Sequence, residues 1–236
     1  MDGQVEQSNQ LVQNGTVSQA KPAAPSEHEP GTASSRLSGF YVPAVRPDNG
    51  VRLAGMRQIQ PTIVVIGFMG AGKTSVGRLV ARALGREFVD TDQMIERAAR
   101  MTIAELFQRE GELSFRRREM AAIDRAISAP GRVIAVGGGA VLSAENRTAL
   151  KQAGLLVYLR ATPETLAGRL TGVTDRPLLK DAADRAGRIR DLLVARGPIY
   201  ETAGDVAIDT DRLNVEQVAV EVMEWYRRRV GAMAGR

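Results

Sequence analysis

The stretch GFMGAGKTS, residues 67–75, holds the side chains of this chain best suited to chemistry on a phosphate group. Gly67, four further residues and then Gly72-Lys73-Thr74 match the glycine-rich loop that binds nucleotide phosphates. The backbone N–H groups of such a loop and the positive end of the following helix surround phosphate oxygens. Lys73 would reach the β- and γ-phosphates as a point charge, and the Thr74 hydroxyl would join the shell of a Mg²⁺ ion. A glycine turn with an incidental lysine is the plain alternative. The motif predicts binding of ATP and Mg²⁺, with nucleotide contacts from Gly70, Ala71, Gly72, Lys73, Thr74 and Ser75.

Two aspartates, Asp90 and Asp92, come at the end of the short apolar run EFVD and just after it. The carboxyl ends of parallel strands line the ligand crevice of an α/β sheet, so we expect both acids to face the nucleotide. One would orient the water shell of the metal ion, and the other would meet an acceptor hydroxyl. The alternative is that Asp92 caps the following helix, because Asp is a favoured N-cap residue. The residues alone leave both interpretations open.

The composition excludes several other kinds of chemistry. The chain has no cysteine, and His28 is its one histidine, so thiolate metal sites, histidine-ligated zinc and Ser-His-Asp triads are excluded. The net charge of +5 comes from 28 arginines and 4 lysines against 27 acids, while aromatic residues are only 4% of the chain. Stacking platforms for single-stranded nucleic acid are therefore scarce, and we assign the arginines to anionic small molecules and solvated helix faces. No apolar run approaches the length of a membrane span.

The elements that must position these residues alternate along the chain from Pro61 onward. Apolar runs at 61–67, 87–90, 132–136, 155–159 and 205–209 predict five strands, with amphipathic helical stretches between them and a closing helix at 215–229. The helical stretch at 93–125 is expected to break near Gly111, and a helix before DVAID is expected to end near Arg196. Alternating strands and helices predict an α/β fold, a five-stranded parallel sheet with helices on both faces.

Residues 1–60 differ in composition from the rest of the chain. They hold 5 of the 10 prolines, 7 glutamines and many serines and glycines, with no sustained period of 2 or 3.6. Such a segment buries too little apolar surface to offset the entropy of ordering, so we predict a disordered extension at 1–60 and a folded domain at 61–236. A targeting peptide is the alternative, but the acids of this segment argue against it.

Five motifs in order give the chain a family resemblance. GFMGAGKTSVGRLVARALGREFVDTD, IAELFQREGELSFRRRE, AVGGGAV, RPLL and RGPIY are similar to the corresponding segments of shikimate kinases, a branch of the phosphate-loop kinases related to nucleoside monophosphate kinases. The resemblance covers about residues 61–229. It implies the three-layer kinase fold with a lid segment, and transfer of a phosphoryl group from ATP to the 3-hydroxyl of shikimate in aromatic amino acid biosynthesis.

The resemblance also assigns roles to residues of this sequence. Arg116 and Arg196 match the arginines that bind the shikimate carboxylate, and a planar guanidinium suits a carboxylate. Asp92 matches the aspartate that binds the ring hydroxyls and is the candidate base. Asp90 matches the carboxylate of the Mg²⁺ water shell. Gly137, Gly138 and Gly139 match a glycine run of the family whose backbone approaches the substrate closely.

Arg176, in TDRPLL, matches the lid arginine and is expected to contact the phosphates and stabilise charge on the transferring group, which makes it both a nucleotide-binding and a catalytic candidate. Arg169 and the loop 209–214 resemble the family's adenine contacts more loosely.

The sequence therefore predicts a shikimate kinase with catalytic residues Lys73, Asp92 and Arg176. We expect a cytoplasmic monomer that binds small-molecule substrates, with no nucleic-acid or membrane partner. A gluconate-type kinase is one alternative, although it would not obviously need both Arg116 and Arg196. A ligand-sensing regulator is the other, although residues 1–60 lack the periodicity of a helix-turn-helix.

Overall fold

The computed structural model describes residues 60–171 and 184–235. The predicted disordered extension at 1–60 therefore lies, except for Gln60, outside the described residues. The predicted lid arginine, Arg176, also lies outside them, within 172–183.

Five parallel strands form one sheet in the order β2-β3-β1-β4-β5. The strands are β1 (Thr62–Ile66), β2 (Phe88–Asp90), β3 (Val133–Ala135), β4 (Gly154–Arg160) and β5 (Val206–Asp209). β1 is central and pairs in parallel with β3 and β4, and all five of its residues are buried. A strand buried on both faces reads as a continuous apolar run, which is why the TIVVI sequence predicts it. The expected α/β fold with a five-stranded parallel sheet is confirmed.

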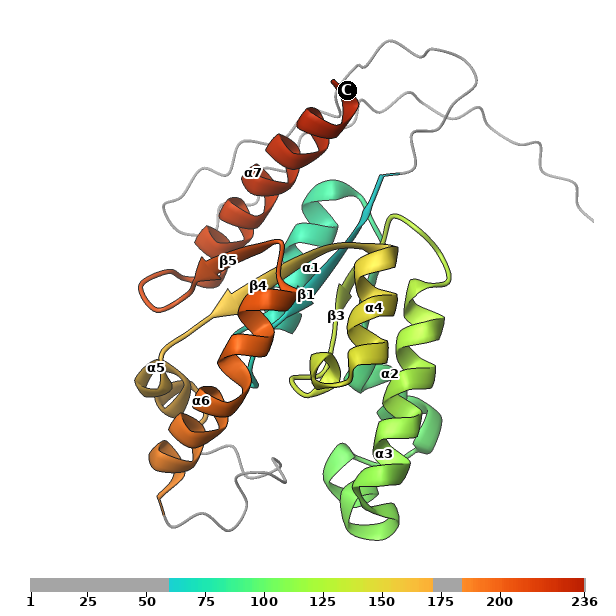
Figure 1. Cartoon of the computed structure of the whole chain (residues 1–236), viewed down its shortest axis with the longest axis vertical. Helices are drawn as coiled ribbons and strands as arrows, with labels where there is room; N and C mark the ends of the chain where they lie inside the picture. Colours follow the sequence, from blue (N-terminus) through green and yellow to red (C-terminus); the bar gives the residue numbers. More distant parts are fainter. Residues whose placement is uncertain (1–59, 172–183, 236) are drawn as a thin grey trace, which may run out of the picture. The chain divides into compact units, whose positions relative to one another are not determined.

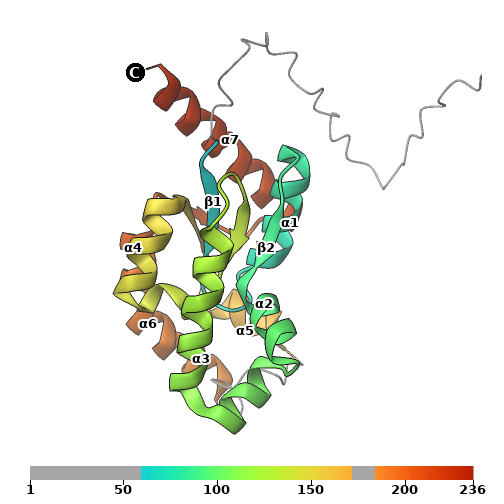
Figure 2. The same cartoon turned by 90° about the vertical axis from the view of Figure 1, so that its right-hand side faces the viewer.

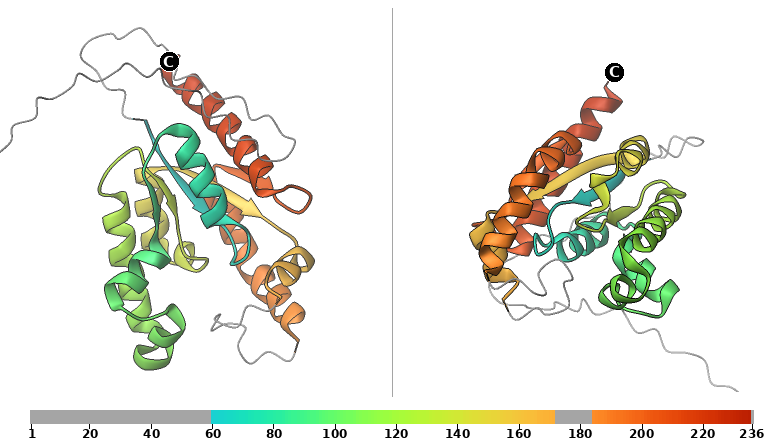
Figure 3. Two further views of the ribbon diagram at one scale, coloured as in Figure 1. Left: turned by 180° about the vertical axis from the view of Figure 1, so that it is seen from behind. Right: turned by 60° about the horizontal axis from the view of Figure 1, so that its bottom comes forward.

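Helices cover both faces of the sheet (Figure 1). α1 (Lys73–Leu84) and α7 (Val215–Ala234) pack together on one face, which Figure 3 shows from behind. On the other face lie α3 (Ile103–Ile127), α4 (Ala144–Ala153) and α6 (Arg185–Ala203). The remaining helices are α2 (Thr91–Ala99), α5 (Pro163–Arg169) and the short 3₁₀ turn η1 (Ala140–Leu142). The main hydrophobic core lies between the sheet and these layers.

α2 and α3 form a small unit with a hydrophobic cluster of its own (Figure 2). Ile95 of α2 packs there with Leu106, Phe115 and Ala122 of α3. α3 is broken at Gly111, whose φ of 79° and ψ of 173° are not helical, as the sequence predicts. Glu110 bridges the break, since its carboxylate accepts hydrogen bonds from Ser114 and Arg118.

Two helix boundaries differ from the sequence prediction. The stretch expected to be one broken helix is also divided at Arg100, which takes φ 53° and ends α2, before Thr102 and Glu105 form a capping box that starts α3. α6 does not end near Arg196 but continues through Pro198 to Ala203. A proline inside a helix costs about 3 kcal/mol, and the complete burial of Tyr200 and Ala203 offsets that cost.

Candidate active site

One cavity of about 300 Å³ lies at the carboxyl ends of the strands. Its lining joins the phosphate loop, the end of β2, the glycine run after β3 and side chains of α3 and α6. The lining residues are Met69, Gly70, Gly72, Lys73, Thr74, Ser75, Asp90, Asp92, Ile103, Phe107, Phe115, Arg116, Glu119, Val136, Gly137, Gly138, Gly139 and Arg196. Among the described residues, every site residue predicted from the sequence except Ala71 therefore lines this cavity, and Arg176 lies outside the described residues.

The phosphate loop has a backbone that only glycines adopt easily. Gly67, Gly70 and Gly72 have φ values of 143°, 80° and 93°. A Cβ at Gly67 would also lie 2.6 Å from the carbonyl oxygen of Leu159 on the neighbouring strand. Ala71 is buried, and its N–H donates to the Phe68 carbonyl at 3.2 Å, so its contact with nucleotide stays a prediction.

Lys73 and Thr74 begin α1 directly behind this loop. No side chain caps the N-terminus of α1, and the first N–H groups of a helix have no carbonyl partner within it. Together with the helix dipole these groups attract an anion. The Lys73 ammonium group donates to the Phe68 carbonyl at 2.9 Å, which holds its charge over the loop.

Thr74 and Asp90 meet across the gap between α1 and β2. The Thr74 hydroxyl donates to Asp90 Oδ2 at 2.7 Å, while Asp90 Oδ1 accepts from the backbone N–H of Gln93 at 3.2 Å. Asp90, rather than Asp92, is thus the N-cap of α2. The capping alternative for Asp92 is wrong, because Asp92 lies in the first turn of α2 and on the cavity.

The oxygen groups of Thr74 and Asp90 fit Mg²⁺, a hard cation that prefers oxygen ligands. Mg²⁺ is usually held by one or two carboxylates together with water and substrate phosphates, not by a full protein cage. Consistently, residues 60–171 and 184–235 contain no group of three or more His, Cys, Asp or Glu side chains that could hold a metal ion.

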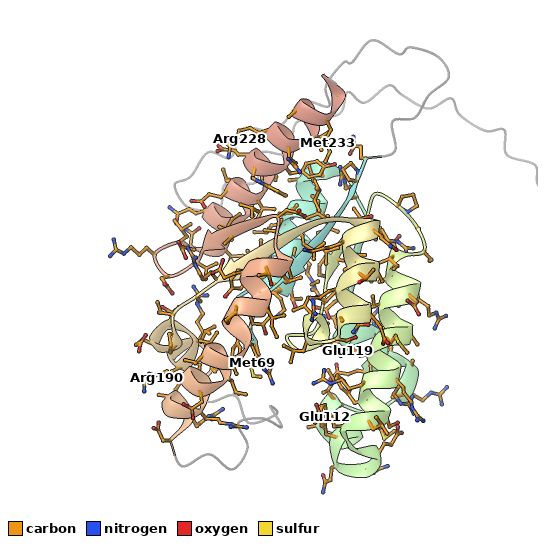
Figure 4. The ribbon with its side chains drawn as sticks, in the orientation of Figure 1. Met69, Glu112, Glu119, Arg190, Arg228 and Met233 are labelled. Atoms are coloured by element: carbon orange, nitrogen blue, oxygen red, sulfur yellow. The ribbon has the colours of Figure 1, made fainter. Side chains whose placement is uncertain are left out.

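Arg116 stands between two glutamates on α3. Its Nη1 donates to Glu119 Oε2 at 2.8 Å, and its Nη2 donates to Glu112 Oε1 at 3.0 Å. The Glu119 side chain is 1% exposed and the Glu112 side chain is 64% exposed, so the arginine joins a buried acid to a solvated one. Figure 4 shows the labelled side chains of Glu112 and Glu119 on α3.

Glu119 is a site residue that the sequence reasoning missed. Burial raises the pKa of its carboxyl group, with Arg116 lowering it and the charge of Asp92 raising it further. One of its oxygens, Oε1, is buried without a hydrogen-bond partner among the described residues. The spacing Arg116-x-x-Glu119 places both side chains on one helix face, which is the signal that could have found it.

Three successive glycines face three different parts of the cavity. A Cβ at Gly137 would lie 2.6 Å from Asp92 Oδ1 and 3.0 Å from Glu119 Oε1. A Cβ at Gly138 would lie 3.2 Å from the backbone nitrogen of Met69 in the phosphate loop. At Gly139 it would lie 2.6 Å from Arg116 Nη1. The run therefore joins the phosphate-loop side of the cavity to the arginine side, and only glycine leaves the required space.

The wall beyond Arg116 is apolar. The rings of Phe107 and Phe115 lie with centroids 4.6 Å apart, on opposite sides of the break at Gly111. Ile103 and Val136 complete this wall. These four residues were also missed, because apolar side chains on helices and strands read as core. Such a wall suits the carbon ring of a small ligand whose polar groups are held elsewhere.

Arg169 and the loop after β5 meet, although the sequence match for both is loose. Arg169 Nη2 donates to the Thr210 carbonyl at 2.6 Å, and its Nη1 donates to the Thr210 hydroxyl at 3.0 Å. The two predicted adenine-facing segments are thus adjacent, and their contact with adenine stays a prediction.

Comparisons with known proteins agree with this geometry. The family model described as shikimate kinase matches residues 69–227. The chain is 49% identical over 169 residues to a shikimate kinase of Symbiobacterium thermophilum, which covers 71% of this chain and 97% of that protein. It is 46% identical over 153 residues to a shikimate kinase of Bordetella pertussis, covering 65% of this chain and 72% of that protein.

Solved structures give the same match. The shikimate kinase of Acinetobacter baumannii in complex with shikimate aligns with a TM-score of 0.69 at 39% identity, covering 72% of this chain and 94% of that one. The shikimate kinase of Bacteroides thetaiotaomicron aligns with a TM-score of 0.64 at 31% identity, covering 71% of this chain and 98% of that one.

Proposed function

This chain belongs to the shikimate kinase family. We propose that its cavity is the site where a phosphoryl group passes from ATP to the 3-hydroxyl of shikimate. The observation that carries the proposal is that one cavity joins a phosphate-binding loop to a wall with two arginines. Shikimate has one carboxylate and three ring hydroxyls, so its site needs fixed cations and hydroxyl acceptors. Gluconate also carries a carboxylate, but it is an open chain with no carbon ring to lie against the apolar wall, and the gluconate alternative is not favoured.

The donor side binds and orients the triphosphate. Gly70, Gly72 and Ser75 present backbone N–H groups to its oxygens, at the positive end of α1. Lys73 moves its ammonium group from the Phe68 carbonyl to the phosphates and stabilises charge that spreads over the transferring group. Arg176 is assigned a second cationic contact to the transferring phosphoryl group, and this assignment rests on the sequence alone.

Thr74 and Asp90 would hold Mg²⁺, since their oxygens already meet at 2.7 Å beside the phosphate loop. When bound, the ion supplies charge neutralisation to the phosphate oxygens. Asp90 keeps its second oxygen on the N-terminus of α2, which fixes the carboxylate in orientation.

The acceptor side binds shikimate by its carboxylate and its ring. Arg116 and Arg196 bind the carboxylate. The glycine run at 137–139 lets the ring lie against the backbone. Asp92 stands between the two sides, beside Gly137. It accepts the hydrogen bond of the attacked hydroxyl and takes its proton as the phosphoryl group moves across.

A coupled assay of ADP release with Mg-ATP tests the proposal, with shikimate, gluconate and water as acceptors. Turnover that depends on shikimate and is lost in Asp92→Asn is the expected result. ATP binding without shikimate-dependent release would overturn it. Shikimate-dependent turnover that survives in Asp92→Asn would remove only the role of Asp92.

We also propose that the protein works as a monomer in the cytoplasm, with no nucleic-acid or membrane partner. The phosphate loop and both predicted carboxylate-binding arginines line one cavity within this chain, which supports catalysis by one copy. No helix among residues 60–171 and 184–235 is long and apolar enough to span a bilayer. Size-exclusion chromatography with light scattering, with and without both substrates, measures the molar mass in solution and so tests the monomer.

A further inference from the structure

Tyr200 lies on α6, one helical turn after Arg196, and its side chain is completely buried. Its ring stacks on the ring of Tyr158 of β4, with centroids 5.2 Å apart. Its hydroxyl, in contrast, reaches the glycine run and donates a hydrogen bond to the Gly138 carbonyl oxygen at 2.5 Å. Burial raises the pKa of Tyr200 to about 12, against the opposing effect of the adjacent Arg196 guanidinium, so the hydroxyl keeps its proton at neutral pH. It is a permanent donor between α6 and the cavity.

The backbone groups of the glycine run are satisfied unequally. The Gly137 carbonyl accepts from Ala140, the Gly139 carbonyl accepts from Leu142, and the Gly137 N–H donates to the Thr91 hydroxyl. Tyr200 satisfies the remaining carbonyl, that of Gly138. In the part of the chain that the structure describes, the N–H groups of Gly138 and Gly139 have no hydrogen-bond partner. Both glycines are half-buried on the cavity wall, so these two N–H groups are available to a ligand.

The hydroxyl of Tyr200 also determines where one of these donors points. The Gly138 carbonyl and the Gly139 N–H belong to the same planar trans peptide, in which the C=O and N–H directions are opposed. A hydrogen bond that pulls the carbonyl toward α6 turns the N–H away from α6. Gly139 lies against Arg116, as the 2.6 Å approach of its Cβ position to Nη1 shows. Gly139 therefore borders the arginine fork on the cavity wall.

We propose that Tyr200 is a positioning residue for the acceptor: its hydroxyl fixes the Gly138–Gly139 peptide so that the Gly139 N–H joins Arg116 and Arg196 in binding one anionic group. The inference rests on the proposed function, which identifies that group as the carboxylate of shikimate. Tyr200 does not touch the acceptor. It acts through the glycine peptide on one side and through Arg196, one turn earlier on its own helix, on the other.

The test is Tyr200→Phe, which removes the hydroxyl and keeps the stacked ring. Tyr158→Phe is the matched control, since it makes the same change in the partner ring, whose hydroxyl lies near the charges of Glu201, Arg160 and Asp209. For Tyr200→Phe we expect the KM for shikimate to rise about tenfold, with the KM for ATP, kcat and Tm close to those of wild type. The control should leave both KM values unchanged.

Other outcomes overturn the proposal. A lower Tm with both KM values unchanged would make Tyr200 a structural residue only. An equal rise of both KM values, or no change at all, would show that the hydroxyl does not act on acceptor binding.

A second measurement does not depend on a variant that folds. In wild-type protein labelled with ¹⁵N, titration with shikimate alone should shift the amide resonance of Gly139 more than that of Gly168, a glycine of α5 with open space around it. A Gly139 resonance that does not respond would overturn the proposal. Wild-type turnover of shikimate is read in the same preparation, so failure of the Tyr200 inference is distinguished from failure of the proposed function.

Discussion

The two sides of the cavity are built on different principles. The donor side is made mainly of backbone: three glycines with positive φ and an uncapped helix N-terminus, all attached to the central strand of the main core. The acceptor side is made mainly of side chains: Arg116 between two glutamates, and two phenylalanines that pack with a separate small cluster of α2 and α3. A site made of backbone binds a ligand through geometry that few residue types allow. A site made of side chains binds it through charges that must themselves be held in place.

This contrast predicts that loss of a donor-side cation affects only the chemistry, and that loss of an acceptor-side cation affects both binding and folding. The largest effect is expected for Lys73→Ala. Lys73 is half-buried, and its ammonium group donates to the Phe68 carbonyl, an acceptor that carries no charge of its own. We expect kcat to fall by about 10²–10³-fold, because a fixed cation facing developing charge is lost, while Tm stays near that of wild type. Steady-state kinetics measure kcat and thermal melts measure Tm. An unchanged turnover contradicts the mechanism.

Arg116→Ala is the acceptor-side counterpart of Lys73→Ala, and it tests the contrast most directly. The KM for shikimate should rise by about ten- to a hundredfold, since a charge-assisted contact is lost, while the KM for ATP changes little. Unlike Lys73→Ala, this variant should also lower Tm, because Glu119 is left buried without its cation. The double variant Arg116→Ala/Glu119→Gln should recover Tm but not the KM.

Arg118→Ala is the matched control, as that arginine pairs with Glu110 and does not line the cavity. Equal rises of both KM values in Arg116→Ala would contradict the assigned carboxylate contact.

The same contrast explains what the sequence could predict. The donor side follows from residue types in fixed order, since Gly72, Lys73 and Thr74 have to be contiguous for the loop to work. The strands follow from apolar runs that a parallel sheet buries on both faces. The acceptor side depends on contacts between distant segments: Glu119 with Asp92, or Tyr200 with Gly138. No local pattern distinguishes these residues from a solvated glutamate or a core tyrosine.

Two boundary errors have local causes. The break at Arg100 was missed because a non-glycine residue with positive φ has no sequence signal, although the Thr102-x-x-Glu105 capping box was readable. The end of α6 was misplaced because Pro198 normally stops a helix, and only the burial of Tyr200 beyond it shows why this one continues.

The glycine run, where the two sides meet, offers a smaller and more local test in Gly139→Ala. The added Cβ would lie 2.6 Å from Arg116 Nη1, the movable end of a long side chain, so the protein should still fold, with a Tm lowered less than in Arg116→Ala because Nη1 also pairs with the buried Glu119. The guanidinium must shift, however, and we expect the KM for shikimate to rise about tenfold. Gly168→Ala, where a Cβ meets nothing within 4 Å, is the control. A KM equal to that of the control would mean that Arg116 does not bind the acceptor from its observed position.

The smallest effect concerns the charge that holds Arg116, and it appears in stability rather than in rate. Because burial raises the pKa of Glu119 above its ordinary value of 4.5, the native state binds a proton more tightly than the unfolded state does. The stabilising contribution of that proton is complete below pH 4.5 and is lost as the pH rises through the raised native pKa. Glu119→Gln cannot titrate. The free energy of unfolding of wild type minus that of Glu119→Gln should therefore decrease with rising pH across this window.

Urea unfolding at several pH values from 4 upward measures this difference, and Glu112→Gln, on the exposed side of the same arginine, is the control. A difference that stays constant with pH would mean that Arg116 compensates the burial of Glu119 fully. The acceptor side would then be as insensitive to proton binding as the backbone-built donor side, and the contrast between the two would be one of architecture alone. A difference that falls with pH means instead that the acceptor arginine is held by a carboxylate that is costly to keep charged, a cost that the donor side avoids by using backbone N–H groups.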